Sequence, residues 1–251
     1  MNRRQFLAAT GLVGSLGLVG AGRGSGERGL SAVVWFSERA AGYDGVESRA
    51  TGYLGAALRA VRDDVQVDVG DRPIPLDEED GTRLMEVEWP KMVLSGVAGR
   101  GSVDRTGDLN LLVTDGDPGA SPAGYGMRGI ATVCGAGLLA SMPPAERTPP
   151  VVPYSAPAVI TQLLLHECGH ALGLEHAHGR VTYEGNAAVV SPMIGGYAWA
   201  DEDLRRRQLP DDANVCGEPI GGVVNRRRLL GLEYGPCARA ALERYRPGVL
   251  P

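Results

Sequence analysis

The sequence contains little lysine, few aromatic residues and no excess of positive charge. Lys91 is the one lysine among the 25 lysine and arginine residues. We interpret this preference for arginine as a sign of genomic base composition or a halophilic habit, and it indicates nothing about a reaction mechanism. The formal net charge of −5 argues against a nucleic-acid surface as the main partner. With two phenylalanines and three tryptophans, a core has to be built mainly from Ala, Val, Leu and Ile. The length of 251 residues fits one globular domain, with or without a short extension.

The amino-terminal apolar stretch is too short for a good membrane-spanning helix. It ends at Gly22, is shorter than about 18 residues and is rich in glycine. It follows a charged start with Arg3 and Arg4, and such a pair is typical of a twin-arginine export signal. An ordinary secretory signal and a short membrane anchor are the alternatives. We expect residues 1–22 to be a signal peptide, cleaved after Ala21. The protein would then be secreted or held at the surface of a prokaryotic cell, with no stable membrane span.

Cysteine is also scarce, with four residues in the chain. Outside the cell these four allow three disulfide pairings. We expect Cys216 to pair with Cys237, because both lie in the C-terminal segment. Cys134 and Cys168 would then form a second disulfide or remain two buried thiols.

Hydrophobic patterns predict a strand, a helix, several strands and then a long buried helix. Residues 23–29 predict a linker, and residues 30–251 the domain. We expect strands at 31–37, 65–69, 83–89, 108–114 and 129–134, and helices at 47–63 and 156–174. Residues 71–81 and 115–127 predict loops, and the five prolines within 141–153 exclude regular structure there. This order predicts an α/β (α+β) sandwich, with a mixed sheet covered by helices.

The clearest motif lies at the end of the long predicted helix. His166 and His170 are four residues apart, so their imidazoles project from one helix face toward one ion. Gly173 can adopt the left-handed conformation that ends a helix and return His176 to the same ion. Three imidazoles leave one position of a tetrahedral zinc open, as in catalytic sites. Glu167 follows the first ligand and can reach that position.

The alternative, a helix of ordinary core histidines, fits the distribution of histidine poorly. All four histidines of the chain lie between His166 and His178. The full pattern HExxHxxGxxH is expected by chance on the order of once in 10⁵ such chains. The spacing therefore predicts one catalytic Zn²⁺.

The motif resembles that of the metzincin superfamily of zinc endopeptidases, whose defined positions it fills completely. These peptidases also have a methionine-containing turn after the third histidine, and Met193 in Ser191-Pro192-Met193 is similar to it; an ordinary core methionine is the alternative. The resemblance implies a zincin fold, with a twisted mixed sheet on a buried active-site helix. It further implies an N-terminal subdomain (30–176), an irregular C-terminal subdomain (177–251) and residues 129–134 as the edge strand that pairs with substrate.

Some residues depart from the family pattern. The tyrosine that ligates zinc in some metzincins is replaced by Gly195, and whether Tyr197, two residues later, reaches the site stays open. The subfamily is not assigned, and the cysteine-rich pattern of archaemetzincins is absent. His178 is more typical of an exposed or supporting residue than of a fourth ligand. Asp115 and Asp117 are candidate Ca²⁺ ligands, with a solvated turn as the alternative.

The resemblance implies an exported zinc-dependent endopeptidase that acts on polypeptides, with Glu167 as the general base for a zinc-activated water. One alternative is a non-catalytic exported module stabilised by zinc. Another is a zinc amidase that acts on cell-wall peptides. The sequence carries no signal for an oligomeric state.

Replacing Arg3 and Arg4 together with lysine should leave the protein inside the cell, because the twin-arginine route reads that pair. Cell fractionation with immunoblotting measures this. Export of the double variant at the wild-type level would show that another route is used.

Overall fold

The computed structural model describes residues 29–119, 122–209, 216, 220 and 222–246. The predicted signal peptide and most of the predicted linker lie outside these residues. Within them, no helix combines the length and apolarity needed to cross a bilayer.

The first sheet is five-stranded and mixed. Four strands are parallel, and the fifth runs antiparallel at one end. In spatial order they are β2 (Val65–Val69), β1 (Leu30–Phe36), β3 (Leu109–Val113), β5 (Ile130–Val133) and β4 (Gly124–Met127). Every residue of β3 is buried, which explains why an almost uninterrupted apolar run forms a central strand. Four predicted strands and the predicted mixed sheet are confirmed.

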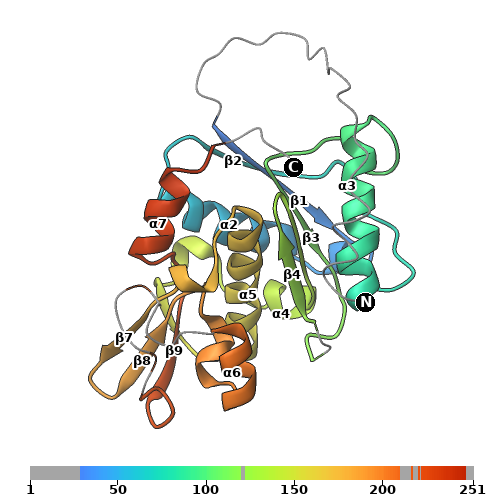
Figure 1. The fold of residues 1–251 in the computed structure, drawn as a ribbon. Helices are drawn as coiled ribbons and strands as arrows, with labels where there is room; N and C mark the ends of the chain where they lie inside the picture. Colours follow the sequence, from blue (N-terminus) through green and yellow to red (C-terminus); the bar gives the residue numbers. More distant parts are fainter. Residues whose placement is uncertain (1–28, 120–121, 210–215, 217–219, 221, 247–251) are drawn as a thin grey trace.

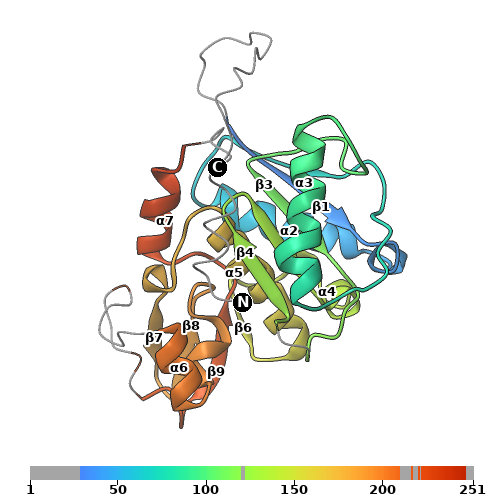
Figure 2. The same cartoon turned by 45° about the vertical axis from the view of Figure 1, so that its right-hand side comes forward.

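Helices cover both faces of this sheet, as Figure 1 shows, and α3 comes to the front in Figure 2. Val34 and Leu111 pack in the core that α2 and α5 cover, whereas Trp35 and Leu112, one position along, pack in the core beneath α3. This alternation follows from the two-residue period of a strand. The helices are α2 (Val46–Arg59), α3 (Trp89–Val97), α4 (Ala136–Ala140), α5 (Ala156–Ala171), α6 (Glu202–Gln208) and α7 (Pro236–Glu243).

The predicted strand at residues 83–89 is wrong. The chain forms a π-helical turn, η2 (Leu84–Glu88), that continues into α3. The apparent alternation covers only seven residues, and it would bury Val87, which is 38% exposed. Leu84, Trp89 and Val93 are buried instead, close to helical spacing.

The C-terminal segment, predicted to be irregular, contributes three strands to a second sheet. Its strands are β6 (Val151–Pro153), β9 (Arg227–Gly231), β8 (Ala187–Val190) and β7 (Val181–Glu184), in that order. β6 precedes α5 in the chain and lies within the proline-rich segment predicted to lack regular structure. The remaining short elements are 3₁₀ turns: η1 (Ala40–Gly42), η3 (Ala145–Arg147), η4 (His176–His178) and η5 (Gly195–Trp199).

Helix α5 lies between the two sheets (Figure 1). Ser155 caps its first turn by accepting a hydrogen bond from the Ala158 amide, and Pro157 occupies a position near the start that tolerates proline. At the other end, the Ala171 carbonyl accepts a hydrogen bond from the Gly129 amide, just before β5. The helix is buried on nearly all sides, as its apolar sequence predicts.

The predicted disulfide between Cys216 and Cys237 is confirmed, with a Cα–Cα distance of 5.8 Å. It joins the segment after α6 to α7. Cys134 and Cys168 are free and buried, so the two buried thiols are the alternative that the structure contains.

The edge strand beside α5 is β4, and the prediction that residues 129–134 form that edge is wrong. β5 is an interior strand, paired with β3 and β4. A Cβ on Gly126 would clash with the Glu167 carbonyl and approach His170 Cβ to 2.7 Å. The prediction of a loop at residues 115–127 is therefore wrong for β4. Its glycines do not mark a turn but leave room for α5, which lies too close for a side chain at Gly126.

Gly126→Ala should therefore lower the melting temperature. Overpacking typically costs about 1–3 kcal/mol, and each kcal/mol corresponds to roughly 2–4 °C in a domain of this size. The matched control is Gly42→Ala, because Gly42 is exposed and a Cβ there meets nothing within 4 Å. Thermal unfolding followed by circular dichroism measures both, and equal melting temperatures would contradict this account of β4.

Candidate metal centre

Helix α5 and the turn that ends it position three histidines. His166 and His170 lie one helical turn apart on the same face of α5. The helix then ends in a Schellman motif: the Leu174 amide donates to the Gly169 carbonyl at 2.8 Å, and the Gly173 amide to the His170 carbonyl at 3.0 Å. Gly173 has φ = +84°, which confirms its predicted left-handed conformation. This turn returns the chain to His176.

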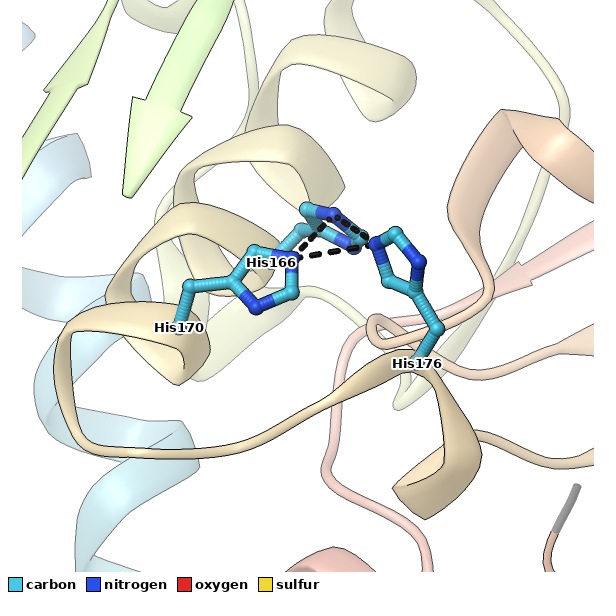
Figure 3. Close-up of side chains that lie close together, drawn as sticks. All are labelled: His166, His170 and His176. Atoms are coloured by element: carbon cyan, nitrogen blue, oxygen red, sulfur yellow. Dashed lines mark hydrogen bonds between the residues drawn. The ribbon is translucent and has the colours of Figure 1, made fainter. Parts of the chain in front are cut away.

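The three imidazole rings point toward a common centre (Figure 3). Their Nε2 atoms are 3.0 Å apart between His166 and His170, 3.1 Å between His170 and His176, and 3.3 Å between His166 and His176. Within the described part of the chain, this is the one group of three or more histidine, cysteine or acidic side chains with ligand-like spacing.

Each imidazole uses its other nitrogen, Nδ1, to hydrogen-bond a backbone carbonyl. The partners are Pro192 for His166 (2.7 Å), Leu174 for His170 (2.9 Å) and Gln208 for His176 (2.6 Å). A carbonyl oxygen only accepts, so each Nδ1 carries the proton, and each neutral ring presents the lone pair of Nε2 inward. No proton therefore lies between the Nε2 atoms, although they are within hydrogen-bonding distance.

The lone pairs create an unfavourable arrangement unless a cation lies between them. Ligands of a tetrahedral zinc at about 2.0–2.1 Å are about 3.3–3.4 Å apart, close to the observed spacing. Carbonyls on the outer nitrogens are the usual partners of metal-bound histidines, since they fix the tautomer and the ring orientation. The residues present therefore fit a zinc ion.

Burial keeps these rings in the neutral form that metal binding needs. It lowers the pKa of His166 to about 3, with a smaller contribution from the neighbouring His170. Burial also lowers the pKa of His170 and of His176. A metal therefore has no proton to displace from any of the three nitrogens near neutral pH.

Glu167 lies beside the triad and faces a cavity of about 480 Å³ that His166 also lines. Its side chain is buried, and its carboxylate has no hydrogen bond or ion pair among the described residues. Burial raises the pKa of this carboxyl to about 8. A Cβ on Gly124 of β4 would lie 2.9 Å from its Oε1 atom, so the edge strand borders the same carboxylate.

Tyr197 and Met193, both in the segment after β8, lie next to the triad. The Tyr197 ring lies 5.7 Å from that of His166 and 5.1 Å from that of His176, centre to centre. Met193 is buried, and its sulfur packs so closely on Gly169 that a Cβ there would clash with it. The structure thus brings both next to the histidines.

The remaining sequence candidates lie apart from this group. His178 Nδ1 accepts a hydrogen bond from the Glu175 amide at 2.9 Å and caps the η4 turn. Asp115 and Asp117 belong to no ligand-like cluster among the described residues, so the calcium prediction has no support. Instead, the Asp117 carboxylate accepts a hydrogen bond from the Gly119 amide, as in a solvated turn.

Comparisons with known proteins add little to this geometry. No protein-family model matches the chain, and no curated protein matches its sequence. Among solved structures, archaemetzincin from Methanopyrus kandleri is similar, with 16% sequence identity and a TM-score of 0.43 over 88% of this chain and 97% of that one. A likeness this low assigns no residue role and no activity.

Gly173→Ala should weaken both stability and zinc affinity. A Cβ there meets nothing within 4 Å, so the cost is that of the left-handed backbone alone, about 1–2 kcal/mol. The affected turn carries the carbonyl partner of His170 and leads to His176. Gly173→Asn is the matched control and should lose less, because asparagine tolerates this conformation better. Thermal unfolding and zinc competition with a chelator measure the two effects; wild-type values for both variants would contradict the role of this turn.

Proposed function

We propose that this protein is a metzincin-like zinc-dependent endopeptidase. The observation that carries the proposal is the inward convergence of three Nε2 lone pairs beside a buried carboxyl group that lines a cavity and has no partner among the described residues. His166, His170 and His176 would hold the ion, and the carboxylate of Glu167 would serve the reaction. A site built only to stabilise the fold is usually closed by four protein ligands.

When bound, zinc would polarise the scissile carbonyl and lower the pKa of a water molecule toward neutrality. Glu167 would accept the proton of that water and later deliver it to the leaving amine. The imidazoles would keep their orientation through the carbonyl hydrogen bonds of Nδ1. Met193, which packs against Gly169 of α5, would support the triad from below.

The edge strand supports a polypeptide as substrate. β4 has one neighbour in its sheet, β5, and borders Glu167 through Gly124. An extended peptide can add to such an edge by main-chain hydrogen bonds, which recognise a backbone and not one particular side chain. The bond to be cleaved would then lie close to the triad.

We further propose that the protein is exported by the twin-arginine route. The disulfide between Cys216 and Cys237 supports export, since disulfides persist in oxidising compartments. Folding before export would allow the histidines to acquire their metal inside the cell.

Two substitutions separate metal binding from catalysis. Glu167→Gln keeps the size of the side chain and all three imidazoles, so zinc should still bind at about one ion per chain. Peptide hydrolysis should fall by at least about 10²–10⁴-fold, the usual contribution of a general base. His176→Ala should lose zinc and activity together, since two imidazoles make an incomplete site. Metal analysis and a peptide-library cleavage assay, each with and without a chelator, measure both.

Each alternative has its own outcome in this experiment. Wild-type protein that holds zinc and cleaves nothing would favour the binding module, and cleavage of cell-wall peptides alone would favour the amidase. Equal hydrolysis by wild type and Glu167→Gln would refute the general-base mechanism. Protein that binds no zinc when it is supplied would refute the site itself.

A further inference from the structure

The cavity beside the triad has an additional polar group in a mostly apolar wall. Gln162 lies on α5 one turn before His166, and only 2% of its surface is exposed. Both residues line the same cavity, together with apolar side chains that include Val159, Leu163 and Leu204. A buried polar side chain in such a wall needs hydrogen-bond partners.

The NH₂ group of the Gln162 side chain has both of its hydrogen bonds within the protein. Its Nε2 atom donates to the carbonyl of Val190 at the end of β8 and to that of Gly231 at the end of β9, both at 2.8 Å. Carbonyl oxygens cannot donate, so the NH₂ group must face the second sheet. The orientation of the amide is therefore fixed.

The carbonyl oxygen of the same side chain, Oε1, faces the cavity. Oε1 has no hydrogen-bond partner among the described residues, and protein atoms do not fully enclose it. A Cβ on Gly195, another cavity residue, would lie 3.9 Å from this oxygen and 3.7 Å from His166 Nδ1. The free acceptor is therefore exposed to the cavity next to the first histidine.

We propose that Gln162 determines specificity in this cavity, by selecting a substrate side chain that ends in an N–H or O–H donor and disfavouring acidic side chains. This inference rests on the proposed function and concerns which residue enters the cavity. The apolar wall accommodates the stem of a long side chain, and Oε1 accepts its terminal hydrogen. An ionised Asp or Glu offers no donor, so it would leave Oε1 without a partner and bring a second acceptor toward it.

Matched peptide hydroxamates test this on the zinc-loaded full-length protein, because a hydroxamate binds zinc and holds the adjacent side chain near the cavity. Three pairs have similar length and differ in the terminal donor: glutamine and methionine, lysine and norleucine, and tyrosine and phenylalanine, of which the last pair differs by the hydroxyl alone. By calorimetry, the hydroxamate whose side chain carries the donor should bind roughly 5- to 100-fold more tightly than its apolar partner. The apolar ligand leaves the buried Oε1 acceptor without a hydrogen bond, and this costs about 1–3 kcal/mol. A glutamate hydroxamate should bind more weakly than the methionine one.

Gln162→Met assigns the preference to this side chain, since it keeps the length and removes the acceptor. The binding ratio within each pair should fall to about one. The ratio is measured on one sample, so it does not depend on any stability lost with the two carbonyl hydrogen bonds. Leu163→Met is the control, because it introduces the same side chain into the same cavity and should keep the wild-type ratio.

Equal affinities within all three pairs for the wild-type protein would overturn the inference, as would an unchanged ratio in Gln162→Met. Failure of every hydroxamate to bind would overturn it too. Binding is measured without hydrolysis, so the proposed function can fail separately. A donor preference in a protein that cleaves no peptide would support the pocket and refute the peptidase.

Discussion

Three hydrogen bonds between imidazole Nδ1 atoms and backbone carbonyls organise the centre of this molecule. The carbonyls belong to three separate segments: Pro192 after β8, Leu174 in the turn after α5, and Gln208 at the end of α6. A buried N–H without its acceptor costs about 1–3 kcal/mol, so each segment has to keep its place. With the rings held in these orientations, their Nε2 atoms converge to within 3.0–3.3 Å of one another. Binding of a cation at this centre would therefore be coupled to the folding of the C-terminal half.

The close approach of β4 to α5 is the second constraint, and it works against local preference. Glycine is a poor strand former, since it loses much conformational freedom and offers no side chain for packing. Gly124 and Gly126 are nevertheless required, because the carboxylate of Glu167 and the backbone of α5 occupy the space of their side chains. The same approach brings a sheet edge next to the triad. Sequence rules fail here because packing on a neighbouring helix decides the outcome.

What the sequence predicts correctly is encoded over short distances. The spacing of His166 and His170 and the left-handed Gly173 depend only on helix geometry, so the motif predicts the triad that the structure contains. The carbonyl partners of the rings have no sequence pattern, because every residue has a carbonyl. Sequence spacing alone does not place Tyr197 for a related reason: the path of the chain after Met193 decides whether its ring reaches the histidines. The strand predicted at residues 83–89 failed because an alternation this short does not exclude a helix.

The polar residues of α5 show how one helix serves both structure and chemistry. Its buried polar side chains are Thr161, Gln162, His166 and Glu167, in an otherwise apolar element. Thr161 donates a hydrogen bond to the Pro157 carbonyl at 3.0 Å, within the helix. His166 uses Nδ1 for the Pro192 carbonyl and directs Nε2 toward the other two histidines. Two of the buried polar side chains of α5 keep an acceptor without a partner among the described residues: the carboxyl group of Glu167 and Oε1 of Gln162. Both belong to residues that line the same cavity. Because buried polar groups are normally paired, this is where a molecule from outside would complete the hydrogen bonding of the helix. A water proton for Glu167 and a side-chain donor for Gln162 would meet that need together.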